Sequence, residues 1–302
     1  MKVVQFTVPV ARDHSIHIQE DILPYFYAHL HRHTETQITY VIKGSGTLIA
    51  GNIMQPFGPG ELFIIGANQP HLFKCDPAYF EKDSTLNIHT LNIYFDSNGY
   101  LSSLLQFPEM SMIKKFIDSS SQGMHASAEN TPMLSDYISR VIQLTQGYRL
   151  ATFIEMLQTM SKLRDWKYLS SQSIEHPISD YEGLRMNDIY QYTMTNYSDN
   201  ISLEEIAAVI HLTPQSFCRY FRKHTLKTYT NFLNEVRVSE ACKKFMTNDF
   251  TSISAIAYQT GFNNVSTFNR VFKSIIGKSP SEYIYQYKTK TSGRESNSIL
   301  NK

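Results

Sequence analysis

Phe217-Cys-Arg219-Tyr-Phe221-Arg222 returns 51 residues later as Phe268-Asn-Arg270-Val-Phe272-Lys273. Upstream, Leu203-Glu-Glu-Ile206-Ala207 returns after only 50 residues as Ile253-Ser-Ala-Ile256-Ala257, so one residue has slipped between the copies. A repeat of this period indicates a duplicated structural unit. We therefore interpret the rest of the chain around the stretch from 201 to 284.

Each copy reads as a short helix, a tight turn and a second helix. In the first copy, Ser202 and Glu205 predict a capping box at the start of the first helix. Thr213 followed by Pro214 predicts the start of the second helix. In the second copy, Gly261 supplies the turn. A single helix over about 229–246 is expected to join the two copies.

The second helix of each copy is amphipathic. Its expected apolar positions are Phe217, Tyr220 and Phe221 in the first copy, and Phe268, Val271, Phe272 and Ile275 in the second. A helix-turn-helix places the start of this helix in the DNA major groove, where Arg, Asn and Gln read base edges. The alternative is a helical bundle with solvated polar faces. An arginine at the same place in both copies favours DNA binding.

The C-terminal third also carries a family resemblance. Phe262-Asn-Asn-Val-Ser-Thr-Phe268-Asn-Arg270-Val-Phe272-Lys273, followed by Gly277-Lys-Ser-Pro280-Ser-Glu-Tyr283, closely resembles the signature of AraC-type transcription regulators. The resemblance implies a bacterial activator or repressor that binds specific DNA sequences. Leu226 stands where that family usually has glycine, so we expect the preceding helix to end without an easy left-handed cap.

The resemblance assigns DNA contacts by position. The implied base-reading residues are Gln215, Cys218, Arg219, Val265, Ser266, Asn269 and Arg270. The implied phosphate contacts are Thr213, Arg222, Lys223, Asn264 and Lys273. Val265 is apolar where a reader is expected, so it would contact a thymine methyl group or nothing.

Charge is distributed unevenly along the chain. Residues 1–180 hold 13 Lys and Arg against 17 Asp and Glu, a net charge of −4, and residues 181–302 hold 15 against 10, a net charge of +5. The basic part carries the repeats, as binding to phosphates requires. The three cysteines lack a Cys-x-x-Cys pattern, and no stretch looks like a signal peptide or membrane span. These features predict a cytoplasmic protein without membrane association.

Short alternating runs broken by Gly and Pro occupy the N-terminal part, from about 19 to 95. We expect strands at 36–42, 46–50, 61–65 and 86–95, which predict a small antiparallel barrel or jelly roll. The spacing of His31, His33, Gln37 and His71 is similar to the cupin motifs, whose His and Glu side chains can bind a metal. Gln37 replaces the glutamate, so we favour a small-molecule pocket over a metal site.

The predicted effector pocket lies in the mouth of the barrel and is mostly apolar, with a few convergent polar groups. Its candidate residues are His31, His33, Gln37, Tyr40 and His71, with Phe63 or Phe73 as a wall. Aromatic faces and amide groups would suit a sugar. If a metal were bound instead, its ligands would be His31, His33 and His71, but we expect neither metal nor other cofactor.

The predicted organisation is an α+β protein of two domains. Residues 1–166 form a cupin-like effector-binding and dimerisation domain, with a short helix near 112–119 and a helix pair over 133–166. Residues 167–183 are the linker, 184–288 the all-α tandem helix-turn-helix domain with a first helix over 184–197, and 289–302 a disordered tail.

Three functions compete. The one we favour is a transcription regulator, not an enzyme, that binds double-stranded DNA as a homodimer, responds to a small molecule and contacts RNA polymerase if it activates. The second is a metal-dependent cupin enzyme fused to a DNA-binding domain. The third is a regulator whose barrel only dimerises. No Ser-His-Asp set, carboxylate pair or phosphate loop offers other chemistry.

Overall fold

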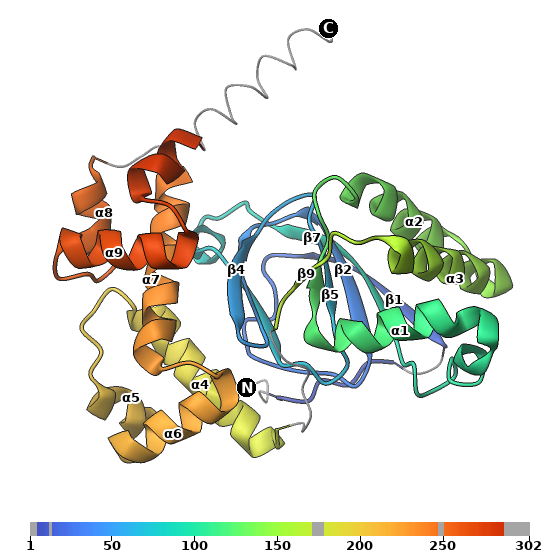
Figure 1. Ribbon diagram of the computed structural model, residues 1–302, viewed down its shortest axis with the longest axis horizontal. Coiled ribbons are helices and arrows are strands. Elements are labelled where there is room, and N and C mark those ends of the chain that lie inside the picture. The colour runs from blue at the N-terminus through green and yellow to red at the C-terminus, as the bar shows by residue number, and fades with distance from the viewer. Residues whose placement is uncertain (1–4, 12–13, 171–177, 247–250, 287–302) are drawn as a thin grey trace, which may run out of the picture. The chain divides into compact units, whose positions relative to one another are not determined.

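The computed structural model of the 302-residue chain describes residues 5–11, 14–170, 178–246 and 251–286 (Figure 1). Contacts divide the chain into two compact units, residues 1–187 and 188–302. Helix α4 (Asp180–Asn196) begins in the first unit and ends in the second. Within the described ranges, no helix is both long and apolar enough to pass through a membrane.

Two antiparallel sheets form the first unit. In chain order its described strands are β1 (Ile16–Leu23), β2 (Thr36–Lys43), β3 (Gly46–Ala50), β4 (Ile53–Phe57), β5 (Leu62–Ile65), β6 (His71–Cys75), β7 (Ile88–Phe95), β8 (Met124–His125) and β9 (Lys167–Tyr168). The larger sheet has the order β1-β7-β2-β5-β8-β9, and the smaller has the order β4-β3-β6. The expected sheet-rich, cupin-like architecture is confirmed.

Alternation along β7 separates two environments. Ile93 and Phe95 enter a buried apolar cluster shared with the helices of this unit. Asn92 and Tyr94, on the other face of the same strand, line a cavity. Successive strand residues point to opposite faces of a sheet, so one strand can contribute to both the core and the site.

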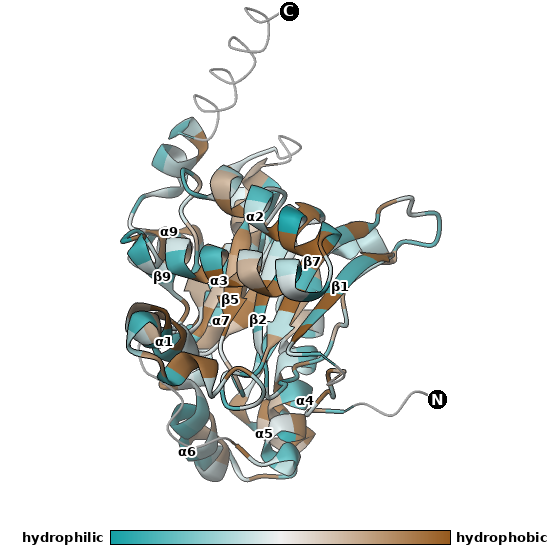
Figure 2. Ribbon diagram, turned by 90° about the vertical axis from the view of Figure 1, so that its right-hand side faces the viewer, coloured by the Kyte–Doolittle hydropathy of each residue, from teal (hydrophilic) through white to brown (hydrophobic). Residues whose placement is uncertain are grey.

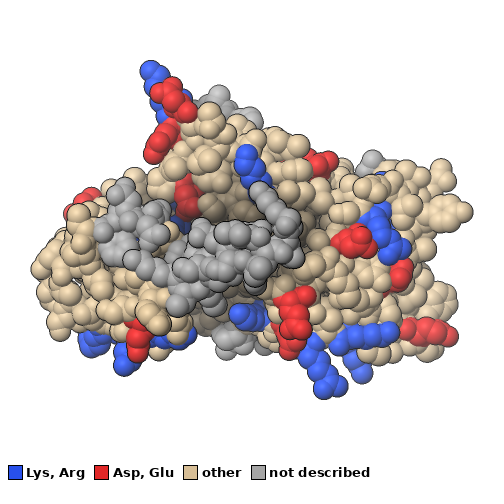
Figure 3. Space-filling view, turned by 90° about the horizontal axis from the view of Figure 1, so that it is seen from above, with Lys and Arg blue, Asp and Glu red and all other residues tan. Residues whose placement is uncertain are grey.

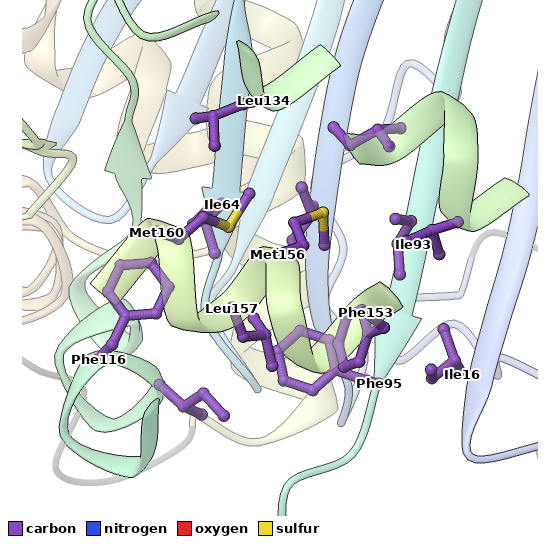
Figure 4. Packing of buried hydrophobic residues seen from close by; sticks show 14 of the residues in the cluster. Ile16, Ile64, Ile93, Phe95, Phe116, Leu134, Phe153, Met156, Leu157 and Met160 are labelled. Carbon is purple, nitrogen blue, oxygen red and sulfur yellow. The ribbon is translucent and has the colours of Figure 1, made fainter. Parts of the chain in front are cut away.

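Helices α1 (Ser111–Ser119), α2 (Thr131–Gln143) and α3 (Gln146–Lys162) cover the larger sheet (Figures 1 and 2). Figure 4 shows Phe153, Met156 and Met160 of α3 pointing at the sheet. The rings of Phe95 and Phe153 meet edge to face, with centroids 5.1 Å apart. Burial of each such side chain contributes about 2 kcal/mol. The predicted helix pair is therefore present, and at least one face of it is occupied by the sheet.

The predicted linker differs from what the structure shows. Lys167 and Tyr168 form β9 and pair with β8, and the next residue, Leu169, is buried in a second cluster among the strands. Helix α4 then starts at Asp180, ahead of the predicted start at Leu184. The rest of the predicted linker, residues 171–177, and the predicted tail, residues 289–302, lie outside the described residues.

The second unit is helical. Its helices after α4 are α5 (Leu203–Val209), α6 (Pro214–Thr225), α7 (Tyr229–Met246), α8 (Ile253–Gln259) and α9 (Val265–Ile276). Helix α7 has the predicted bounds and runs between the pairs α5/α6 and α8/α9 (Figure 1). Tyr190 of α4 packs on Phe232 of α7 with ring centroids 5.0 Å apart. The predicted tandem arrangement, two helix pairs on one connecting helix, is confirmed.

Candidate nucleic-acid interface and effector cavity

Helix α6 begins with the predicted cap. The Thr213 side chain accepts a hydrogen bond from the Ser216 amide, and Pro214 follows in the first turn. Phe217 and Phe221 are fully buried. The three implied base readers of this helix, Gln215, Cys218 and Arg219, are all exposed. The capped end of α6 therefore presents polar side chains to solvent while its aromatic face holds the helix in place.

Helix α9 repeats this arrangement. Asn264 is its cap, with Oδ1 accepting from the Thr267 amide at 2.7 Å. Of the four implied readers in this helix, Ser266, Asn269 and Arg270 are exposed. Val265 is half-buried against the apolar cluster of the second copy, so its side chain serves packing at least in part.

Ile275 corrects the prediction of the apolar face of α9. It was expected to be buried with Phe268 and Phe272, but 39% of it is exposed. Phe268 and Phe272 lie four residues apart, whereas Ile275 lies near the end of the helix, where less of the second unit covers it. Tyr220, expected to be buried in α6, is half-buried.

The implied phosphate contacts divide into two groups. Arg222, Lys223 and Lys273 are exposed cations in the last turns of α6 and α9. Thr213 and Asn264 instead use their side-chain oxygens to cap helices. A phosphate at those caps would meet backbone amides at the helix N-terminus, which favour anions.

The one-residue slip between the copies lies in the turn. Helices α5 and α8 both have 7 residues, and α6 and α9 both have 12. The turn between them spans residues 210–213 in the first copy and 260–264 in the second. His211 (φ 56°) and Gly261 (φ 87°) occupy the same left-handed position, 50 residues apart. The slip thus leaves the helices themselves unchanged.

Leu226 corrects the prediction for the end of α6. We expected the helix to end without an easy left-handed cap, yet Leu226 adopts φ 61° and ψ 10° and donates its amide to Arg222 O at 2.9 Å. Gly277 closes α9 in the same way, with φ 81° and a bond to Lys273 O. The first copy therefore reaches the glycine conformation with a leucine, at a cost of about 1–2 kcal/mol.

Charge on the molecular surface is mixed. On the face drawn in Figure 3, Lys and Arg groups alternate with Asp and Glu groups and, apart from the grey residues, form no continuous basic field.

A cavity of about 350 Å³ lies inside the first unit. Its polar lining includes His31, His33, His71, Gln37, Asn92, Tyr94, Asp21 and Gln19. Its apolar and aromatic lining includes Phe26, Tyr27, Phe73, Leu23 and Ile88. The N-terminal segment supplies Gln5, Val8, Pro9, Val10 and Ala11. That segment is held beside the cavity because Val8 N donates to Arg32 O at 2.8 Å and Arg32 N donates to Phe6 O at 2.7 Å.

Three histidines meet at the polar end of the cavity. The ring centroids of His31 and His71 are 4.3 Å apart, and those of His33 and His71 are 5.0 Å apart. Each Nδ1 contacts a backbone carbonyl oxygen: His31 that of His29 at 2.9 Å, and His71 that of Gln69 at 2.9 Å. A carbonyl oxygen only accepts, so these Nδ1 atoms carry the ring protons.

A chain of hydrogen bonds holds the third ring. His33 contacts two carbonyl oxygens, Glu35 O through Nδ1 at 2.7 Å and Gln37 Oε1 through Nε2 at 2.8 Å. Gln37 Nε2 donates to Thr39 Oγ1 at 2.7 Å, and Thr39 Oγ1 donates to Asn92 Oδ1 at 2.7 Å. These contacts orient a buried ring and a buried amide, so this end of the cavity is preorganised.

Burial controls protonation in the cavity. Burial lowers the pKa of His31 to about 4 and the pKa of His33 and His71 below the ordinary value for histidine. Burial also raises the pKa of Tyr94, with the carboxylates of Asp21 and Glu35 adding to the effect. At neutral pH the rings of His31 and His71 are therefore uncharged.

The residues do not fit a cupin metal site. The ring nitrogen of His33 that a third ligand would need is directed at the Gln37 amide. Among the described residues, no group of three or more His, Cys, Asp or Glu side chains has a geometry able to hold a metal ion.

Four of the five predicted pocket residues, His31, His33, Gln37 and His71, line this cavity, and Tyr40 does not. Tyr40 packs against the cluster under the helices, because it lies an odd number of residues from Gln37 and so on the opposite face of β2. Phe73 supplies a wall, whereas Phe63 stacks on His125.

The sequence-based prediction of the pocket did not include three residues that line the cavity: Asp21, Asn92 and Tyr94. Alternation of Asn92 and Tyr94 with Ile93 and Phe95 in a predicted strand was a usable signal, because it sends two polar residues inward. Asp21 had no such signal, because β1 was not predicted as a strand. It faces the cavity beside Asn92, which donates to Asp21 Oδ2 at 2.9 Å.

The chain was compared with known proteins. Residues 206–286 match a family of Helix-turn-helix domains, and residues 20–77 match the Cupin domain. An uncharacterised HTH-type transcriptional regulator of Staphylococcus aureus (strain MSSA476) is 22% identical over 283 residues, which cover 90% of this chain and 34% of that protein. The chain thus spans about a third of the length of these curated relatives. The HTH-type regulator YdiP of Escherichia coli K12 is 31% identical over 103 residues, 34% of each chain.

Solved structures give similar matches at low overall similarity. ToxT from Vibrio cholerae O395 is 16% identical with a TM-score of 0.35, covering 90% of this chain and 97% of that one. A DNA-binding transcriptional dual regulator from Escherichia coli K-12 is 22% identical with a TM-score of 0.33, covering 39% and 99%. Taken with the sheets of the first unit and the paired helices of the second, the two domain matches show that the chain joins a cupin domain to a helix-turn-helix domain.

Proposed function

We propose that the chain is a transcription regulator that binds specific DNA sequences through α6 and α9. The observation that carries this proposal is the exact repetition of helix lengths and exposed arginines in the two copies. Arg219 and Arg270 are both exposed, lie 51 residues apart, and occupy the same position in helices of 12 residues. Arginine is the side chain best suited to reading guanine in the major groove.

The cavity of the first unit supports a regulated form of this function. Within its polar lining His33, Gln37, His71 and Asn92 are buried and held by hydrogen bonds, which is the construction of a small-molecule site rather than of packing alone. We propose that a small effector, for which a sugar is one candidate, binds there. We propose no catalytic role for the cavity.

The proposed mechanism uses two copies of the chain. Homodimers would place two second units on paired half-sites, and the effector would change how readily both engage. If the protein activates transcription, RNA polymerase is a further partner. Its place of action would be the cytoplasm.

Selection of bound fragments from the source genome tests the central proposal. The intact chain is mixed with sheared genomic DNA, and the most enriched fragment is titrated over a salt series. The expected result is affinity well above that for random DNA, falling steeply as salt rises.

Two other outcomes would be decisive. Equal retention of all fragments would show a protein that binds DNA without reading sequence. Failure to retain DNA, both with the intact chain and with residues 178–302 alone, would rule out DNA-binding regulation.

A further inference from the structure

We propose that the cavity selects its ligand by charge: it accepts a molecule that donates hydrogen bonds and rejects one that carries a carboxylate or phosphate. Nε2 of His31 and Nε2 of His71 are the acceptors that receive the ligand's hydrogens. This inference rests on the proposed effector-binding function and deepens it by naming the chemistry of the effector.

The first argument is the direction of the hydrogen bonds. Nδ1 of His31 and Nδ1 of His71 donate to carbonyl oxygens, each at 2.9 Å. A neutral imidazole has one donor and one acceptor, so each Nε2 keeps a lone pair. The ring centroids lie 4.3 Å apart and both residues line the cavity, so its wall carries two acceptors on neighbouring rings. A hydroxyl or ammonium group satisfies such a pair, whereas a carboxylate presents only further acceptors.

The second argument is the charge of the lining. Among the described residues that line the cavity there is no lysine and no arginine, while the carboxylate of Asp21 lies on its wall. Burial lowers the pKa of His31 and His71, so these two rings are neutral at physiological pH and supply no positive charge beside their acceptor nitrogens. An anionic ligand would therefore lose its hydration without gaining a cation.

The nearest guanidinium does not serve the cavity. Arg32 lies between His31 and His33 in the sequence, but its side chain is absent from the lining. Its NH1 donates to Ile178 O at 2.7 Å, and its NH2 pairs with Asp180 Oδ1 at 3.1 Å. Neighbouring residues of extended backbone point in opposite directions, which explains why the positive charge is outside and the rings are inside.

Hydroxyl and ammonium ligands share this chemistry, and the remaining walls suit either. Asp21 could accept from both groups. Phe26 and Phe73 stack with centroids 5.2 Å apart and offer aromatic faces to a ring or to a cation. The experiment below separates the two.

Ligand triplets with one shared skeleton and three end groups test the proposal. Glucose, glucosamine and glucuronate form one triplet; benzyl alcohol, benzylamine and benzoate form another, and further pentose and alkyl triplets widen the range. Binding to the full chain at pH 7.5 is followed by the fluorescence of Trp166, the single tryptophan, and by thermal stabilisation. The expected result is binding among the alcohols or amines and at least about tenfold weaker binding of the matched acids.

Two substitutions that each replace one carboxylate by an amide test which side chain produces the selectivity. Asp21→Asn should weaken amine binding by about tenfold and change alcohol binding by less than about threefold. Glu20→Gln is the matched control, because Glu20 is the adjacent residue of β1, pairs with His89 at 2.6 Å and does not line the cavity. It should leave every affinity unchanged. Loss of amine binding in both variants alike would show a general surface effect and contradict the role given to Asp21.

The possible outcomes distinguish selection of the ligand by charge from effector binding itself. Acids that bind as tightly as their matched alcohols, with binding lost in His71→Asn, would overturn charge selection and leave effector binding intact. If no member of any triplet binds while the chain still binds its operator, both effector binding and charge selection fail, and DNA binding alone remains.

Discussion

Leu226 illustrates how a single residue can hold a helix end in a conformation that suits glycine. It adopts the left-handed conformation that Gly277 adopts at the same place in the second copy. Its side chain is 49% exposed, so little packing is lost by removing it. Leu226→Gly should stabilise the second unit by about 0.5–1 kcal/mol, since relief of about 1–2 kcal/mol of strain outweighs the flexibility that glycine adds to the unfolded chain.

Urea unfolding of residues 178–302, followed by helical circular dichroism, measures this effect. Gly277→Ala is the mirror control, because it forces a side chain into the same conformation and should destabilise by about 1 kcal/mol. A Leu226→Gly variant less stable than the parent chain would show that the leucine side chain contributes more than its exposure indicates.

His31 should make the first unit sensitive to acid. Burial lowers the pKa of His31 to about 4 in the folded chain, against the ordinary histidine value of 6.5. The unfolded chain therefore binds more protons between these values, and the folded state loses stability as pH falls from about 6.5 to about 4, by about 3 kcal/mol. Above pH 6.5 this contribution is constant.

Urea unfolding at pH 7.5 and pH 5, followed by Trp166 fluorescence, reports this change, because Trp166 packs on Phe116 in the first unit. His31→Asn should flatten the dependence on pH, whereas exposed His211→Asn in the second unit should not. An unchanged slope in His31→Asn would assign the acid sensitivity to other groups.

At the scale of elements, α6 and α9 are expected to read bases while their last turns hold phosphates. Arg219→Ala and Arg270→Ala should each weaken binding to the selected operator by about 1–3 kcal/mol and weaken binding to random DNA by less. Lys273→Ala, a cation in the last turn of α9, should weaken both by similar amounts and lower the salt dependence. Fluorescence anisotropy on both DNAs measures the difference. Equal losses on the two DNAs for the arginine variants would show that they contact only phosphate.

The helices were more predictable from sequence than the strands. α7 has the predicted bounds because its apolar spacing and its position between two repeats both point to one helix. β4 and β6 were not among the predicted strands. They have only 5 residues each, and β4 includes Pro56, which is typical of an edge strand and weakens the strand signal. Tyr40 was misplaced because its polar hydroxyl outweighed its odd spacing from Gln37. The cavity's hydrogen-bond chain depends on register between β2 and β7, which sequence spacing alone does not supply.

At the scale of the whole molecule, the two-unit organisation predicts different behaviour on one and two half-sites. If the first unit dimerises the chain, a second half-site should raise the apparent affinity of the intact chain by about 10²-fold, because the second contact becomes intramolecular. For residues 178–302 alone, the apparent affinity should rise only by the statistical advantage of having two equivalent half-sites. Titration of both proteins on DNA with one and with two half-sites measures this. An equal gain for both proteins would show that the first unit is not the dimerising part.

The sequence predicted a linker over residues 167–183, whose two ends belong to β9 and α4 in the structure. Polar, serine-rich composition marked residues 167–183 as linker, yet β9 is held by pairing with β8 through its backbone, which composition does not report. The start of α4 at Asp180 was missed because its first turn is polar and lacks the apolar period seen further along the helix.

The two copies of the helix-turn-helix differ in how much room they have left to change. The second copy has glycine at both left-handed positions, Gly261 and Gly277, and a Cβ at Gly261 would lie 2.6 Å from Tyr197 O. The first copy has His211 and Leu226 at the same two positions. In the first copy, glycine at His211 and at Leu226 would relieve backbone strain. These two substitutions could offset the stability lost when new base-reading side chains are introduced. The second copy already has glycine at both positions and cannot gain stability in this way. Altered DNA specificity should therefore arise more readily in α6 than in α9.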